Sequence, residues 1–161
     1  MLRSLCVLVI ALATAFSASA EEIPSVLVKD LTGKTIDTAT LSNDGKPFAI
    51  SFFTTWCKPC MRELKAIAEV YPDWQDETGM KMYIVSIDEA QNVSKVKPLV
   101  DAEGWDYDVL LDTNSDLFRA LGIQSVPHMI VVDGQGNIVL THSGYTDGAE
   151  EEIIRKIREV M

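Results

Sequence analysis

Two cysteines separated by two residues form the part of this sequence best suited to chemistry. The motif Cys57-Lys58-Pro59-Cys60 follows an apolar run and precedes a helical pattern. Unpaired N–H groups and the dipole at the start of a helix favour an anion, so this position lowers the pKa of the first thiol. Because thiolate is the form that attacks sulfur, Cys57 is the predicted exposed nucleophile. Cys60, one helical turn later, is predicted to be more buried and to displace whatever becomes attached to Cys57.

Three other interpretations of the pair fit less well. A structural disulfide that closes so short a loop would add little stability. A zinc site normally needs four ligands, and after residue 20 the sequence offers these two cysteines with His128 and His142. Unpaired core thiols are uncommon in exported proteins, and residues 1–20 indicate that this protein is exported. We therefore expect a redox-active disulfide between Cys57 and Cys60, with no metal and no cofactor.

The elements that must position this pair alternate between strands and helices. Residues 47–53 form a short, aromatic-rich apolar run that predicts a buried central strand leading directly into the cysteines. Apolar residues at three- and four-residue steps then predict a helix, which we expect Pro72 to kink or to end early and Gly79 to close. The elements predicted next are a strand at 82–87, a helix at 92–102, a strand at 108–111 and a short helix at 115–121.

Both ends of this pattern add β-structure. Residues 25–28 and 34–41 flank a turn and predict an N-terminal β-hairpin, and residues 126–132 and 137–140 predict a second one. A last helix is predicted to start near Asp147, with Glu150 completing a capping box. This order implies a single α/β domain over residues 21–161, with a mixed central β-sheet flanked by helices on both faces.

Residues 1–20 have the features of a cleaved signal peptide. Arg3 supplies a positive start, an uncharged run follows, and the small residues 18–20 match a signal peptidase site before Glu21. The apolar stretch is shorter than the roughly 20 residues that span a bilayer, so we expect cleavage rather than a retained anchor, and no stable membrane insertion afterwards. We therefore expect a periplasmic or otherwise exported protein.

The charge of the chain excludes one class of partner. The formal net charge is −10, and it becomes −11 once residues 1–20, with Arg3 and no acidic residue, are removed. Non-specific nucleic-acid binding needs a cationic surface that displaces counterions, so we expect no nucleic-acid partner.

Residues 52–60, with the sequence Phe-Phe-Thr-Thr-Trp-Cys-Lys-Pro-Cys, together with Glu63 and Ser125-Val126-Pro127, resemble the thioredoxin superfamily. More narrowly, the chain resembles the TlpA/ResA-like exported thiol–disulfide oxidoreductases, from about residue 24 to residue 160. The resemblance implies a thioredoxin-like fold and dithiol/disulfide exchange with disulfide-containing protein substrates. It also implies a membrane thiol donor that resupplies electrons.

The resemblance further implies that the Val126–Pro127 bond is cis. Only roughly 5% of X-Pro bonds are cis, so the residues alone would equally allow an ordinary proline at the start of a strand. The substrate groove would be formed by Trp56, Pro59, Val126 and Pro127, with the backbone of Val126 pairing with an extended client segment. His128 is expected to line the same groove, and His142 has no expected role.

Glu63 lies three residues after Cys60, on the same helix face. In ResA-like proteins a glutamate at this place helps to manage the protons of the two thiols. Thioredoxin instead has a buried aspartate at the strand position that is Ser51 here. We expect Glu63 to be partly buried, to have a raised pKa, and to exchange a proton with Cys60. The alternative is a solvated first-turn glutamate that interacts favourably with the helix dipole.

Two rival functions remain open at this point. A peroxiredoxin-like peroxidase would align Thr54 and Cys57 with its signature, but that signature requires proline where this chain has Ile50. A copper(I)-binding chaperone of the Sco type would use cysteines one residue further apart, although Cys57, Cys60 and His128 contain suitable soft ligands.

The direction of exchange is set by redox potential and partners. Lys58-Pro59 lacks the histidine of strongly oxidising motifs, so we expect a reductant of exported protein disulfides. Cytochrome c maturation is one role that the resemblance implies.

Overall fold

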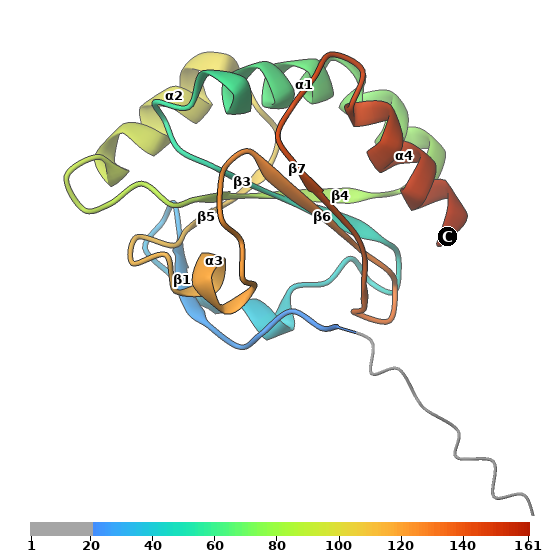
Figure 1. Ribbon diagram of the computed structural model, residues 1–161, viewed down its shortest axis with the longest axis horizontal. Helices are drawn as coiled ribbons and strands as arrows, with labels where there is room; N and C mark the ends of the chain where they lie inside the picture. Colours follow the sequence, from blue (N-terminus) through green and yellow to red (C-terminus); the bar gives the residue numbers. More distant parts are fainter. Residues whose placement is uncertain (1–20) are drawn as a thin grey trace, which may run out of the picture.

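The structure is a computed structural model, which describes residues 21–161, and a mixed seven-stranded sheet forms its centre (Figure 1). The predicted signal peptide at residues 1–20 lies outside the described residues. Within residues 21–161, no helix has the length and apolar character needed to cross a membrane. The strands are β1 (Leu27–Asp30), β2 (Thr35–Asp37), β3 (Phe48–Phe53), β4 (Lys81–Ser86), β5 (Asp108–Leu111), β6 (His128–Val132) and β7 (Ile138–Ser143).

The strand order is β2-β1-β5-β4-β3-β6-β7. Strands β3, β4 and β5 are parallel, whereas β6 pairs with β3, and β1 with β5, in the antiparallel sense. The mixed sheet and the N-terminal hairpin of β1 and β2 confirm the sequence prediction. The second arm of the hairpin is shorter than predicted, because a 3-10 turn at Thr38–Thr40 replaces the end of the strand.

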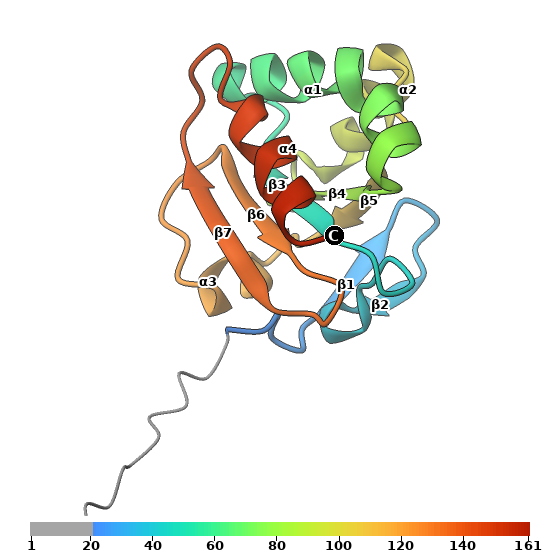
Figure 2. The same cartoon turned by 90° about the vertical axis from the view of Figure 1, so that its right-hand side faces the viewer.

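Helices cover both faces of the sheet, as predicted (Figure 2). The helices α1 (Lys58–Thr78), α2 (Val96–Glu103) and α4 (Glu150–Glu159) lie on one face, and α3 (Asp116–Ala120) lies on the other. Each face has its own apolar cluster. Leu64 and Ile157 belong to the cluster beneath α1 and α4, and Leu117 belongs to the cluster beneath α3.

Helix α1 continues through Pro72, so the prediction of an early end was wrong. Proline costs an interior helix one backbone hydrogen bond and a steric clash. That cost is offset by the buried face of the helix, where Leu64, Ile67, Tyr71 and Trp74 pack into the core while Pro72 faces solvent. Gly79 ends the helix with φ of 64°, a left-handed conformation that glycine adopts without strain.

Three smaller predictions also differ from the structure. The helix predicted at 92–102 is a 3-10 turn at Val93–Lys95 followed by α2. The capping box predicted for α4 is absent, because the helix begins after Ala149, which makes no side-chain cap. Strand β6 begins after Pro127, which has no N–H to donate to a sheet ladder.

Candidate functional site

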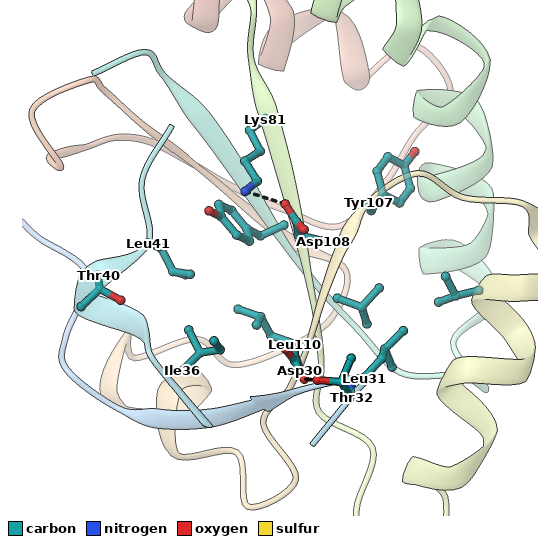
Figure 3. Close-up of a pocket in the computed structure, with 13 residues that line it drawn as sticks. Asp30, Leu31, Thr32, Ile36, Thr40, Leu41, Lys81, Tyr107, Asp108 and Leu110 are labelled. Carbon is teal, nitrogen blue, oxygen red and sulfur yellow. Dashed lines mark hydrogen bonds and ion pairs between the residues drawn. The ribbon is translucent and has the colours of Figure 1, made fainter. Parts of the chain in front are cut away.

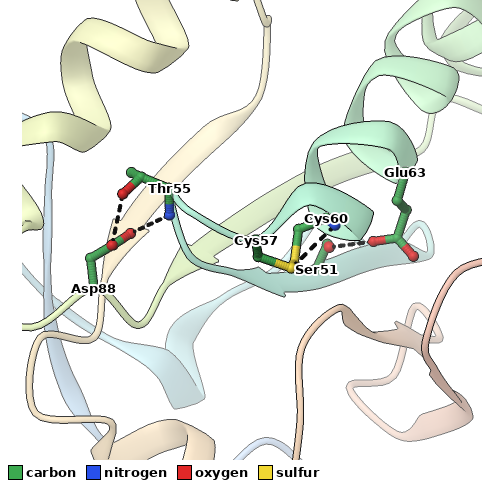
Figure 4. Close-up of a disulfide and its surroundings, with 6 residues drawn as sticks. All are labelled: Ser51, Thr55, Cys57, Cys60, Glu63 and Asp88. Carbon is green, nitrogen blue, oxygen red and sulfur yellow. Dashed lines mark hydrogen bonds between the residues drawn. A yellow bond between two sulfur atoms is a disulfide. The ribbon is translucent and has the colours of Figure 1, made fainter.

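The two cysteines lie where β3 gives way to α1 (Figure 4). A tight turn leads out of the strand, with the N–H of Cys57 donating to the carbonyl of Thr54 at 3.1 Å. Cys57 caps α1, because its Sγ accepts the N–H of Cys60 at 3.2 Å. Pro59 occupies the first turn, where its missing N–H would have no helical partner. Cys57 Sγ therefore lies where helix N–H groups and the helix dipole stabilise a thiolate.

Cys57 and Cys60 are joined by a disulfide, and their Cα atoms are 5.3 Å apart. Cys60 is completely buried, as predicted. Cys57 is only 6% exposed, so it is more accessible than Cys60 but far less exposed than predicted. Its remaining surface faces a groove, so access to its sulfur is from one side.

A buried carboxylate fixes the turn that carries the motif. Asp88 directly follows β4 and accepts hydrogen bonds from the N–H and the hydroxyl of Thr55, both at 2.8 Å. It also accepts a hydrogen bond from Ser86 Oγ at 2.9 Å. The sequence interpretation assigned no role to Asp88. The sequence did offer a signal for this role, because Asp88 is an acidic residue directly after the buried strand that follows the cysteine motif.

The groove beside Cys57 has a volume of about 660 Å³. Trp56, 69% exposed, and Pro59 form part of its lining, and Val126 contributes from the loop before β6. The Val126–Pro127 bond is cis, as the resemblance implied. Pro127 itself is buried, and its carbonyl accepts the N–H of Gly144 at 2.8 Å. The sequence interpretation missed three further lining residues from separate elements, Ile87, Phe118 and Gln124.

Glu63 points inward from α1 and is 3% exposed. Its Oε2 accepts a hydrogen bond from Ser51 Oγ at 2.9 Å, beside the disulfide (Figure 4). Burial raises the pKa of Glu63 to about 7; the Ser51 hydrogen bond opposes that shift, and the negative charge of Glu150 adds to it. The expected burial and raised pKa of Glu63 are therefore confirmed, and the solvated alternative was wrong. A carboxyl with this pKa can take or give a proton near neutral pH.

His128 does not line the groove, so that expectation was wrong. It pairs across the sheet with Phe52, which belongs to the cluster on the α3 face, whereas both cysteines belong to the cluster on the α1 face. The Nδ1 of His128 lies 2.7 Å from Ser143 Oγ. Within residues 21–161, no three His, Cys, Asp or Glu side chains gather closely enough to hold a metal ion. The copper site of Cys57, Cys60 and His128 is therefore not assembled.

A second hollow, of about 450 Å³, lies between the N-terminal hairpin and β5 (Figure 3). An ion pair between Lys81 and Asp108, at 2.7 Å, forms part of its wall. Lys81 pairs with Phe48 at the start of β3, whereas the cysteines follow the end of that strand. None of the predicted site residues lines this hollow.

Comparisons with known proteins agree with this geometry. The model of the AhpC/TSA family matches residues 20–141. The chain is 31% identical to the thiol–disulfide oxidoreductase ResA of Bacillus thuringiensis, over a region that covers 74% of this chain and 66% of that protein. The chain thus spans about two thirds of the length of that relative.

Solved structures extend the likeness. An uncharacterized thioredoxin-like protein from Porphyromonas gingivalis is 57% identical, with a TM-score of 0.78 over 86% of this chain and 90% of its own. A putative thiol:disulfide interchange protein DsbE from Chlorobium tepidum has a TM-score of 0.74 over 88% of this chain and 96% of its own. At 16% identity the second likeness shows the fold alone.

The fold is therefore thioredoxin-like, and the ResA relatives together with the Cys57–Cys60 disulfide support a thiol–disulfide oxidoreductase. Position 50, where a peroxiredoxin signature needs proline, is a buried isoleucine within β3. By the extent of the family match, this chain belongs to the AhpC/TSA family.

Proposed function

We propose that this protein is an exported oxidoreductase that reduces protein disulfides through Cys57 and Cys60. The observation that carries the proposal is the placement of this pair at the start of α1, with Cys57 open to a groove and Cys60 enclosed beside Glu63. Export is supported by the signal-peptide pattern of residues 1–20.

The reduction cycle follows from these positions. In the dithiol form, the Cys57 thiolate attacks one sulfur of a client disulfide, which forms a mixed disulfide and releases one client thiolate. The Cys60 thiol then gives its proton to the Glu63 carboxylate and attacks Cys57 Sγ. The second client thiolate leaves, and the Cys57–Cys60 disulfide forms. Two electrons pass from the protein to the client, and a membrane thiol donor restores the dithiol.

The groove supports a protein client rather than a small disulfide. Its lining is mainly apolar, and the exposed Trp56 extends it along the surface. An extended client segment would place apolar side chains in the groove and pair with the backbone near Val126. This arrangement would hold the client disulfide against Cys57, which lines the groove, whereas Cys60, the other cysteine of residues 21–161, does not.

A reducing role is supported by the sequence between the cysteines. Lys58-Pro59 lacks a histidine that would over-stabilise the thiolate and make the disulfide a strong oxidant. Exported proteins whose thiols must stay reduced, such as apocytochromes during cytochrome c maturation, are the proposed clients.

A trapping experiment tests this function. Cys60→Ala removes the group that resolves the mixed disulfide, so clients should remain attached to Cys57 and be identified by mass spectrometry of an extract. Cys57→Ala is the matched control, because its remaining thiol is enclosed, and it should trap none of them. If the Cys60→Ala variant captured no more protein than the Cys57→Ala variant, exchange through Cys57 would be refuted.

A further inference from the structure

Two aromatic side chains occur among the described residues that line the groove beside Cys57, and they come from separate parts of the chain. Trp56 belongs to the turn that leads into α1, whereas Phe118 belongs to α3, on the other face of the sheet (Figure 1). Phe118 is half-buried, and its ring packs edge-to-face against that of Phe52 on β3, with 5.9 Å between the ring centres. The ring of Phe118 is therefore a packed part of the groove wall, while Trp56 is mostly exposed.

The backbone of Phe118 is held as well. Its N–H donates to Asp112 Oδ2 at 3.0 Å, and its carbonyl accepts the N–H of Ile123 at 3.1 Å. Asp112 directly follows β5, is 3% exposed, and accepts the N–H of Asp116 through its other oxygen at 2.8 Å. Both oxygens of this buried carboxylate thus bind N–H groups of α3, which fixes where the ring of Phe118 lies.

Asp112 is the counterpart of Asp88 on the neighbouring strand. Strands β4 and β5 run parallel side by side, and each is followed by one of these buried aspartates. The N–H of Asp112 donates to the carbonyl of Ser86 at 2.9 Å, and Ser86 Oγ donates to Asp88, which holds the turn before Cys57 (Figure 4). One aspartate therefore holds the Cys57 side of the groove, and the other holds the Phe118 side.

Phe118, Ile87 and Val126 give the groove an apolar side. All three line the groove and pack against the apolar cluster on the α3 face. Among the described residues that line the groove, Lys58 is the only charged one, and it belongs to α1. An apolar side chain gains free energy when it is buried in such a place, whereas a charged one would lose water with no opposite charge to replace it.

We propose that Phe118 is a specificity-determining residue that selects protein clients with a large apolar side chain, such as leucine, next to the reacting cysteine. The inference rests on the proposed exchange through Cys57. The apolar side chain enters the Phe118 subsite, formed by Phe118, Ile87 and Val126, while the client sulfur lies at Cys57. Asp112 does not line the groove, so it is a positioning residue that acts through Phe118.

A purely structural role for Phe118 makes a different prediction. Leu121, directly after α3, is also half-buried and packs against the same apolar cluster, but it lines a different hollow. If Phe118 only covered that cluster, Phe118→Ala and Leu121→Ala would both lower stability, and neither would change which clients react. Leu121→Ala is therefore the matched control.

The test measures the Cys57 step on short peptides. Each peptide has one cysteine, whose sulfur is bonded to thionitrobenzoate, with leucine, alanine or aspartate directly before or directly after it. The Cys57 thiolate of the reduced full chain attacks the peptide sulfur, and thionitrobenzoate, the better leaving group, departs as a coloured thiolate. The peptide remains on Cys57 until Cys60 displaces it. On one side of the cysteine, the leucine peptide should react about tenfold faster than the alanine peptide, and the aspartate peptide should be slowest.

The variants then locate the source of this preference. Phe118→Ala should lower the ratio of the leucine rate to the alanine rate from about tenfold to below about threefold, whereas Phe118→Leu should keep most of it. Leu121→Ala should leave the ratio unchanged. Asp112→Asn should lower the ratio, because the amide nitrogen cannot accept an N–H, and it should cause no further loss in the Phe118→Ala background.

The possible outcomes separate this inference from the function on which it rests. A parent protein that reacts equally fast with the leucine, alanine and aspartate peptides overturns the subsite without any variant. A ratio that survives Phe118→Ala, or that Leu121→Ala lowers as much, overturns the role of Phe118. If Asp112→Asn alone leaves the ratio unchanged, the positioning role of Asp112 is overturned. If the parent releases no more thionitrobenzoate than Cys57→Ala does, exchange through Cys57 itself fails.

Discussion

Ser51 and Glu63 meet across the boundary between β3 and α1, twelve residues apart in the sequence. Thioredoxin has a buried aspartate at the strand position that is Ser51 here, and the sequence predicted that Glu63 on the following helix is the buried acid instead, as the structure shows. The hydroxyl of Ser51 then donates to that acid, which keeps a polar contact in an enclosed site. In this chain the buried carboxyl therefore lies on α1 rather than on β3.

The raised pKa of Glu63 has a consequence for stability. An ordinary glutamate titrates near 4.5 in the unfolded chain, and Glu63 titrates at about 7 in the folded protein. The folded state therefore binds more protons between these values, and the stability associated with the protonated form is lost as pH rises through 7. Because one pKa unit corresponds to about 1.4 kcal/mol, keeping Glu63 ionised above pH 7 costs about 3 kcal/mol.

Glu63→Gln should remove this cost while keeping an acceptor for Ser51. We expect the oxidised variant to gain up to about 3 kcal/mol in unfolding free energy at pH 8 relative to the parent, and much less at pH 5. Denaturant titrations of both proteins at the two pH values check this. An equal difference at pH 5 and pH 8 would show that Glu63 has an ordinary pKa.

At the scale of elements, the pattern of apolar residues predicted the positions of the strands well. Strand 108–111 has the predicted bounds, and the apolar run at 47–53 is β3, because a buried parallel strand needs a short continuous apolar stretch. Pro72 is the main failure. Local preference favours a break there, but burial of Tyr71 and Trp74 on the same helix outweighs it, and that burial depends on contacts that the local sequence does not contain.

Replacing Pro72 by alanine should therefore stabilise the protein. Alanine restores an interior N–H and improves helix propensity at an exposed position, so we expect a gain of about 1 to 2 kcal/mol in unfolding free energy. Pro98→Ala is the control, because Pro98 lies in the first turn of α2, where no interior bond is lost, and it should change stability by less than about 0.5 kcal/mol. Equal effects of the two variants would contradict this account of α1.

Asp88 connects two elements, because it follows β4 and holds the turn that carries Cys57. Asp88→Ala should leave the N–H of Thr55 without its acceptor, at a cost of about 2 to 3 kcal/mol in unfolding free energy. Denaturant unfolding checks this, with Asp76→Ala on the exposed face of α1 as the control. A loss no larger than that of the control would show that the turn does not depend on Asp88.

At the scale of the whole molecule, strand order brings the site together. Strand β3 lies between β4 and β6. The turn after β3 that carries Cys57, the turn after β4 that carries Asp88 and the Val126–Pro127 loop before β6 therefore meet at the same end of these three strands. The sequence identified Cys57, Cys60 and Glu63, because these three residues lie close together in the chain and their spacing alone places them on one helix turn after another. It could not identify Ile87, Phe118 or Gln124, because their places in the groove depend on how strands and helices pack.

Equilibration with glutathione tests the central claim most directly. The purified protein would be incubated over a range of reduced-to-oxidised glutathione ratios, and free thiols at Cys57 and Cys60 would be labelled and counted by mass spectrometry. We expect one two-electron transition with a midpoint more negative than about −200 mV, on the reducing side where thioredoxin and glutaredoxins lie. A pair that stayed disulfide-bonded, or stayed fully reduced, across the whole range would contradict an exchange role for these cysteines.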